Sequence, residues 1–278
     1  GIDYERGDEL VFVPILPSEP FPQQSTVPSA EDLPDAMVKA LMEDAPAEAV
    51  VNNVGGVLNV ARAARDYGVS TFVLVSTDKA VNPTSVMGVT KRISEILLQN
   101  LQQNHGTLFI SVRFGNVLDS SGSVLQLFRH QILNGGPVTV RGENSERYFM
   151  SKREAVSLVM QASVIGQGGE LFTLDMGEPL KIKTLAEMMI SLFGLEPYKD
   201  IDIVVTDLEK GEKLREELSF QDEHLVPTSY DKLGVIKSKD IADDCIGHIM
   251  SIVESVDVLE PEEIKKQMVA VVPEYRPT

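Results

Sequence analysis

The residue types that could carry proton-transfer chemistry are concentrated in one short segment of this chain. An apolar run over 71–75 is typical of a buried strand, and it leads directly into a polar segment that includes Asp78 and Lys79. A carboxylate beside an amine can act as a general acid and base pair. The segment therefore predicts a strand that ends at a site.

A helix after this segment brings a second lysine to the same place. Asn82 and Pro83 indicate a turn, and a helical pattern begins at about Val86. Met87 and Lys91 are four residues apart, so they share one helical face, which looks back at the strand end. Open α/β folds bind their ligands outside the carboxyl ends of the strands, and the sequence predicts a ligand site there.

Two motifs carry a resemblance to a known family. Ser-Thr-Asp-Lys-Ala-Val-Asn-Pro at 76–83 and Val-Met-Gly-Val-Thr-Lys at 86–91 resemble the polysaccharide-biosynthesis branch of the extended short-chain dehydrogenases, the UDP-N-acetylglucosamine 4,6-dehydratases. Most such dehydrogenases carry Tyr-x-x-x-Lys, whereas Met87 stands in place of the tyrosine, as in the larger, membrane-anchored members of the branch. The resemblance covers roughly 41–230. Further matching segments lie at 112–118, 120–124, 147–150 and 211–214.

The resemblance implies both a fold and an activity. The expected fold is α/β, a Rossmann-like doubly wound parallel sheet with a smaller α/β substrate-binding cap. The expected reaction oxidises C4 of a UDP-sugar with NAD or NADP, eliminates water across C5 and C6, and returns the hydride to C6. The product would be a UDP-4-keto-6-deoxy sugar for surface polysaccharide biosynthesis, and a homo-oligomer is expected.

The resemblance also assigns roles to single residues. Asp78 and Lys79 match the acid and base of the elimination, and Lys91 matches the lysine that holds the nicotinamide ribose. Met87 cannot act as a base, so either a neighbour or the substrate itself must assist C4 oxidation, and Thr77 is the close neighbour in the family pattern. The remaining expected positions are Ser76, Phe114 and Gly115 for the cofactor, and Asn116, Ser123, Val124, Arg147 and Glu212 for the nucleotide-sugar.

A role for Lys79 as the C5 base sets a condition on its charge. The amine must be partly neutral near pH 7, which burial or Lys91 would favour and Asp78 would oppose. Replacement of Lys79 by Met is then expected to stop elimination and leave the fold intact.

Three features depart from the family pattern. No Gly-x-Gly-x-x-Gly sequence is present to bind the cofactor pyrophosphate, and the family's first three strands are not recognisable. Glu209 stands where the family has a phosphate-binding arginine, and Asp119 where it usually has glycine. These departures keep a second class of function open, a catalytically impaired nucleotide-sugar-binding or assembly module. A 4-epimerase is a weaker alternative, because the pair Asp78–Lys79 and Met87 argue against it.

The pattern along the chain predicts three parts. Residues 1–40 are a Pro-rich lead-in of unclear role, 41–135 a partial Rossmann-like core, and 136–278 a mixed substrate-binding part with C-terminal helices. Asn53 is expected to tie the central helix to a neighbouring strand. The predicted strands are 10–13, 71–75, 108–114, 138–140, 148–150, 171–174 and 201–205, and the predicted helices are 54–66, 86–103, 124–133, 154–163, 185–193 and 237–270.

Composition excludes several classes of function. The net charge of the 278 residues is −17, which argues against nucleic-acid binding and docking on anionic membranes. One cysteine, Cys245, excludes an internal disulfide framework, and the four histidines show no metal-ligand spacing. No apolar stretch has the length of a membrane span. A cytoplasmic location is expected, with the soluble part of a membrane-anchored enzyme as the alternative.

Overall fold

A six-stranded sheet forms the centre of the computed structural model, which describes residues 10–13, 42–102, 106–118, 120, 123–220, 223–237 and 244–277. The strand order is β1-β2-β3-β8-β12-β11, in which the first four strands are parallel and the last two form an antiparallel hairpin. The strands of this sheet are β1 (Leu10–Val13), β2 (Thr71–Thr77), β3 (Leu108–Phe114), β8 (Leu171–Leu174), β11 (His224–Pro227) and β12 (Leu233–Lys237). The expected Rossmann-like α/β fold is confirmed.

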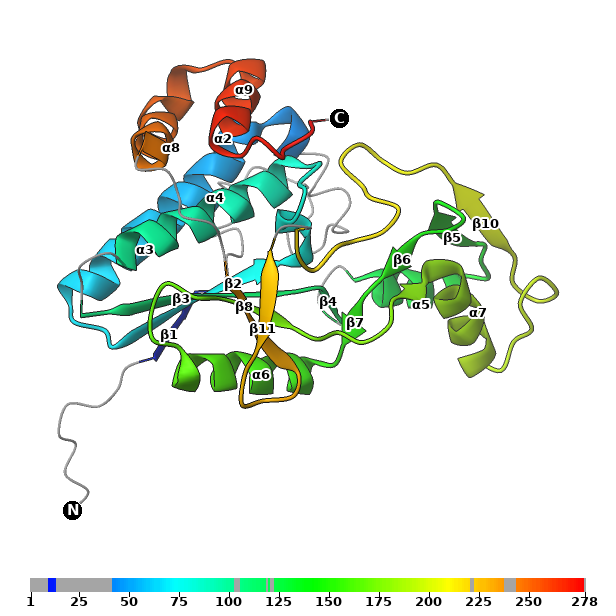
Figure 1. Ribbon diagram of the computed structural model, residues 1–278. Coiled ribbons are helices and arrows are strands. Elements are labelled where there is room, and N and C mark those ends of the chain that lie inside the picture. Colours follow the sequence, from blue (N-terminus) through cyan, green and yellow to red (C-terminus); the bar gives the residue numbers. More distant parts are fainter. Residues whose placement is uncertain are drawn as a thin grey trace.

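Helices cover both faces of this sheet, with α6 on one face and α2, α3, α4, α8 and α9 on the opposite face (Figure 1). Successive residues of β2 explain the two layers, because Phe72 and Leu74 pack into the core under α3 and α4 while Val73 packs toward α6. The helices around the sheet are α2 (Pro46–Ala49), α3 (Gly56–Asp66), α4 (Val86–Leu101), α6 (Lys152–Ile165), α8 (Asp244–Ser255) and α9 (Pro261–Val271).

A smaller α/β part lies beside the main sheet and has its own hydrophobic core (Figure 1). Its parallel strands are β5 (Val138–Arg141) and β10 (Ile203–Thr206), and its helices are α5 (Val124–Leu133) and α7 (Ile182–Leu192). Two short strand pairs complete it: β4 (Asn116–Val117) with β7 (Phe149–Met150), and β6 (Glu146–Arg147) with β9 (Leu180–Lys181).

Several predicted elements differ from those observed. The segment at about 237–270, predicted to be helical, contains two helices, α8 and α9, because Pro261 can open a helix but not continue one. Its first residue, Lys237, belongs to β12 instead. The predicted strand over 148–150 is shortened to β7, β6 precedes it as a separate strand, and 201–205 is displaced to 203–206. Asn53 has a structural role, but it donates to Thr90 of α4 at 2.9 Å rather than to a strand.

A buried ion network fixes the loop after β10 to the sheet. Arg113 of β3, which has no exposed side-chain surface, bonds to Glu95 of α4 at 2.7 Å and to Glu223 at 3.0 Å. Its Nη1 also donates to the carbonyl of Leu218. A buried charge needs such a full set of partners to be tolerated, so this arginine anchors the loop that follows β10 over the carboxyl ends of β2 and β3.

Candidate active site

The carboxyl end of β2 presents a buried acid joined to a lysine. The strand ends at Thr77, whose side chain accepts from the Lys79 amide and begins a short 3-10 turn over Asp78–Ala80. The Thr77 hydroxyl donates to Oδ1 of Asp78 at 2.9 Å. Lys79 Nζ donates to the same oxygen at 2.8 Å, and the Asp78 side chain is fully buried. The predicted pair is therefore assembled by this single turn.

Two residues that follow β3, Gly115 and Asn116, close the pair on its other side. Asn116 accepts from Lys79 Nζ at 3.4 Å and donates to the carbonyl of Tyr148. Gly115 is needed here, because a Cβ would lie 2.9 Å from Oδ2 of Asp78. That oxygen is buried and has no hydrogen-bond partner among the described residues. An orphaned buried carboxylate oxygen is costly, and it marks a place where a ligand can bind.

The charge of Lys79 differs from the expectation for a base. Burial would lower the pKa of Lys79, but the carboxylates of Asp78 and Glu216 outweigh burial and raise it above the usual lysine value. The expectation of a partly neutral Lys79 is therefore wrong for the free protein, in which Lys79 is the cation of the pair.

Helix α4 places Lys91 against the end of β2, as the spacing predicts. The Ser85 hydroxyl caps the helix by accepting from Gly88, and Lys91 Nζ donates to the Val75 carbonyl at 3.4 Å. Burial lowers the pKa of Lys91 from 10.5 to about 8, although Glu95 opposes the shift. Met87 lies half-buried in the first turn of the same helix. Lys91 is thus held close to the strand end and loses its charge unusually easily.

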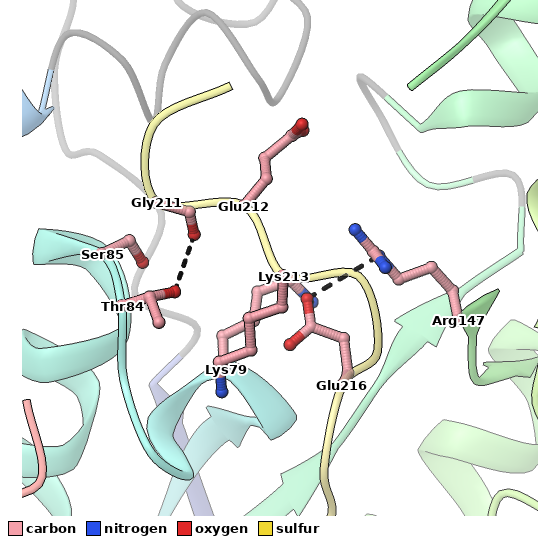
Figure 2. Close-up of a pocket in the computed structure, with 8 residues that line it drawn as sticks. All are labelled: Lys79, Thr84, Ser85, Arg147, Gly211, Glu212, Lys213 and Glu216. Carbon is pink, nitrogen blue, oxygen red and sulfur yellow. Dashed lines mark hydrogen bonds and ion pairs between the residues drawn. The ribbon is translucent and has the colours of Figure 1, made fainter. Parts of the chain in front are cut away.

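A cavity opens beside the pair, between the start of α4 and the loop after β10 (Figure 2). The loop is tied to the helix by Thr84, which donates to the Gly211 carbonyl at 3.0 Å. Gly211 has a φ of +75°, and a Cβ there would lie 2.9 Å from that of Ser85. The lining residues are Lys79, Thr84, Ser85, Arg147, Gly211, Glu212, Lys213 and Glu216. Three cations and two carboxylates therefore surround one space.

Glu209, which stands where the family has an arginine, forms an ion pair with a neighbouring arginine. Glu209 lies 2.5 Å from Arg141 of β5, and the same arginine reaches Glu212 at 3.3 Å. Arg147 lies nearer the pair, where it donates to the Leu214 carbonyl at 3.1 Å. The guanidinium groups in this region therefore come from β5 and β6 rather than from position 209.

The other expected residues lie around this centre in different ways. Ser76 donates to Glu95 at 2.5 Å, so its hydroxyl is engaged with α4, and Phe114 packs with the core under α6. Ser123 precedes α5 without capping it, and its hydroxyl is buried with no partner among the described residues. Val124 packs against the core of the smaller part. Asp119 lies outside the described residues, as do 1–9 and 14–40 of the lead-in.

The sequence motifs did not indicate three residues that the structure brings to this place. Arg141, Lys213 and Glu216 come from β5 and from the loop after β10. Arg141 pairs with Glu209, Lys213 donates to the Val81 carbonyl, and Glu216 faces Lys79. Lys213 lies within the 211–214 match and Glu216 just beyond it, whereas Arg141 on β5 has no such signal.

The described residues fit part of a nicotinamide dinucleotide. Lys91 is a buried amine at the strand end, where it could hold the nicotinamide ribose, and Oδ2 of Asp78 is an orphaned acceptor nearby on the same strand end. The pyrophosphate, by contrast, needs a glycine-rich turn at a helix N-terminus, and the sequence has none. No described helix is long and apolar enough to cross a membrane.

Comparison with known proteins shows which family the chain belongs to. The capsular polysaccharide biosynthesis protein CapD of Staphylococcus aureus is 46% identical over 235 residues, which are 82% of this chain and 39% of that protein. The chain thus spans about two fifths of that relative's length. The structure of Pen from Bacillus thuringiensis is 34% identical with a TM-score of 0.66, over 72% of this chain and 62% of that one.

A more distant structure shares the fold alone. It is the dTDP-glucose 4,6-dehydratase DesIV of Streptomyces venezuelae, a double mutant with NAD bound, at 20% identity and a TM-score of 0.55 over 61% of this chain and 57% of that one. Residues 36–238 match the family described as "Polysaccharide biosynthesis protein". With this match and the CapD similarity, the chain belongs to the polysaccharide biosynthesis protein family.

Proposed function

We propose that this chain carries the catalytic centre of a nucleotide-sugar 4,6-dehydratase that acts on UDP-N-acetylglucosamine or a close relative. The observation that carries the proposal is the buried pair Asp78–Lys79 at the carboxyl end of β2, with one carboxylate oxygen left without a partner. A pair that is buried beside a cavity and shares one proton is suited to proton transfer on a bound substrate.

The pair can serve both proton transfers of an elimination. A bound nicotinamide cofactor would supply the hydride acceptor at C4 and the hydride donor at C6. With C4 a ketone, the pair takes the C5 proton and protonates the C6 oxygen, which leaves as water. In the free protein the shared proton lies on Lys79, and its transfer along the 2.8 Å bond to Asp78 would make Lys79 the base and Asp78 the acid.

Met87 leaves the C4 hydroxyl proton to another residue. Its thioether cannot take a proton, whereas Thr77 touches the pair through a 2.9 Å bond to Asp78. Thr77 can therefore pass the C4 proton to Asp78 during oxidation, while Lys79 releases its own proton to solvent, so that the pair again shares one proton when elimination begins. The absence of an ionisable group at position 87 and the adjacent acid and lysine favour elimination over a 4-epimerase reaction.

The cavity supplies contacts for the nucleotide end of the substrate. Arg147 can bind a diphosphate oxygen with its planar guanidinium, and Glu212 can accept from ribose hydroxyls. Asn116 and Ser123 offer amide and hydroxyl groups to the sugar, and Val124 an apolar contact. In this arrangement the diphosphate end lies at Arg147 and the reacting carbons lie at the pair.

Product analysis tests the proposal directly. The chain is incubated with UDP-N-acetylglucosamine and added NAD or NADP, and the nucleotide-sugar is followed by mass spectrometry. The expected result is a product that has lost one water, with no such product from Asp78→Asn. Unchanged substrate, in a protein shown by calorimetry to bind both cofactor and UDP-sugar, would contradict the proposal.

A second function is favoured by the pairing of charges within the site. Arg141 is paired with Glu209 and Glu212, and Arg147 with Glu216. A chain whose cations are already neutralised, and which lacks the glycine-rich turn, could bind a nucleotide-sugar without turning it over. Calorimetry with NAD and the ultraviolet absorbance of the purified protein decide between the two. Stoichiometric bound cofactor would exclude this non-catalytic module.

A further inference from the structure

The loop after β10 places one carboxylate between the two functional cations of the cavity (Figure 2). Oε1 of Glu216 lies 3.9 Å from Nζ of Lys79 and 3.7 Å from Nε of Arg147. The Glu216 side chain is only 4% exposed, and its Oε2 is buried without a partner among the described residues. One carboxylate therefore links the proposed elimination centre to the proposed diphosphate contact.

Hydrophobic burial does not explain this position. On the same loop, Leu214 is 44% exposed, and Arg215 and Glu217 are also exposed, whereas Glu216 is buried. This is the reverse of the usual pattern, in which leucine is buried and the charged glutamate stays in water. Burial of a carboxylate is tolerated only beside cations, and the cations here are Lys79 and Arg147.

We propose that Glu216 is a positioning residue that holds Lys79 as a cation directed at Asp78 and holds Arg147 beside it. The inference rests on the proposed function, because it gives Glu216 its purpose in the elimination. Glu216 does not need to touch the reacting carbons. It acts through Lys79, whose proton is shared with Asp78 at 2.8 Å.

The charges that face Lys79 come from three elements. Asp78 lies on the same turn, Glu216 lies on the loop after β10, and Arg147 opposes them from β6. Lys213, on the same loop as Glu216, adds a further positive charge near Lys79. Without Glu216, one carboxylate would face two cations, and Lys79 would release its proton more easily.

Replacement of Glu216 by Gln tests this without any turnover. The lysine side chains are labelled with carbon-13 at Cε, the Lys79 signal is assigned from the spectrum of Lys79→Arg, and its pKa is read from an NMR titration. We expect Glu216→Gln to lower the pKa of Lys79 by about one unit or more. The matched control is Glu217→Gln, which removes the same charge from an exposed neighbour and is expected to leave Lys79 unchanged.

The activity profile gives a second readout. The limb of the pH–rate profile that reports the ionisation of Lys79 should move to lower pH in Glu216→Gln, whichever member of the pair takes the C5 proton. The same limb should not move in Glu217→Gln. If every variant lacks activity but the Lys79 pKa still moves, the proposed function fails and the role of Glu216 stands.

An unchanged Lys79 pKa in a folded Glu216→Gln protein overturns the inference. If Glu216→Gln does not fold, Glu216→Asp takes its place, because its carboxylate is withdrawn by one methylene from Lys79. The pKa of Lys79 in Glu216→Asp is then expected to lie below its value in the natural protein. If the two values are the same, the inference is overturned.

Discussion

At the scale of single residues, the ionisable groups at this sheet edge set one another's charge. Lys79 is held as a cation by Asp78 and Glu216, while Lys91, with only Glu95 to oppose its burial, has its pKa lowered to about 8. Two lysines at the end of the same strand therefore differ in charge state because of their partners. The difference in charge state suits Lys79 to proton transfer with Asp78, and it suits Lys91 to holding a neutral or cationic ligand group.

Replacement of Lys79 by Met should affect both activity and stability. Loss of a proton-transfer group should reduce the elimination rate by about 10²–10⁴. The structure corrects the expectation of an intact fold, because Asp78 would remain fully buried without its cation, at a cost of about 3 kcal/mol. Urea denaturation of Lys79→Met and of the double variant Asp78→Asn/Lys79→Met measures this. The double variant should regain most of the lost stability, and equal stability of the two would contradict the argument.

Lys91 should make stability depend on pH in the alkaline range. Between about 8 and 10.5 the unfolded chain holds a proton on this lysine and the folded protein does not, so stability rises with pH across this interval. The penalty is fully present below about 8. Lys91→Met should therefore be more stable than the natural protein at pH 7 by about 3 kcal/mol, and the difference should shrink toward pH 10.5. A difference that is independent of pH would show that Lys91 folds with its usual pKa.

At the scale of elements, the site depends on how closely β3 ends beside the turn after β2. The two strands pair in register from Thr71 with Leu108 to Thr77 with Phe114. Gly115 then passes directly against Asp78, and β4 carries Asn116 onto Lys79. The glycine lets the backbone after β3 pass close to the orphaned oxygen of Asp78.

Gly115→Ala should disturb this contact. The new Cβ would lie 2.9 Å from Oδ2 of Asp78 and 3.2 Å from Cβ of Tyr148, so either Asp78 or β7 must move. We expect at least a tenfold loss of activity, of the size that a small misplacement of a catalytic group produces. The control is Gly106→Ala, where a Cβ would meet nothing within 4 Å. Equal kinetics of both variants would show that Asp78 has room to adapt.

Local sequence predicted the parts of this site that a single element determines. Asp78 and Lys79 follow a clear apolar strand, and Lys91 follows Met87 by one helical turn, so their convergence could be foreseen. Glu216 could not, because its placement depends on a long loop anchored by the distant Arg113. Arg141 could not either, because it lies on β5, whose pairing with β10 is remote in the sequence. The hairpin of β11 and β12 was missed because Pro227 argues against a strand, although an edge strand tolerates it.

At the scale of the whole molecule, the C-terminal helices complete the core above the sheet. Ile249, Ile264 and Met268 are fully buried in the same cluster as α3 and α4. Tyr275, just beyond α9, is 1% exposed, and its hydroxyl has no partner among the described residues. The tail therefore contributes apolar packing to the layer that carries Lys91.

Two substitutions at Tyr275 separate its ring from its hydroxyl. Tyr275→Phe removes an unsatisfied buried group and should leave stability unchanged or raise it by about 1 kcal/mol. Tyr275→Ala removes the ring and should cost about 3–5 kcal/mol. Thermal unfolding measures both. A clear loss of stability in Tyr275→Phe would reveal a hydrogen-bond partner for the hydroxyl.

The last residues of the chain also touch the loop before α4. The Arg276 amide donates to the Pro83 carbonyl at 2.9 Å, at the turn that leads into Met87 and Lys91. This amide can exchange its hydrogen for deuterium only when the tail separates from the turn. A ligand that orders the turn must therefore slow deuterium uptake at an amide it never contacts. By the reciprocity of linked equilibria, a partner that separates the segment around Arg276 from the turn must lower the binding affinity of that ligand by the same factor.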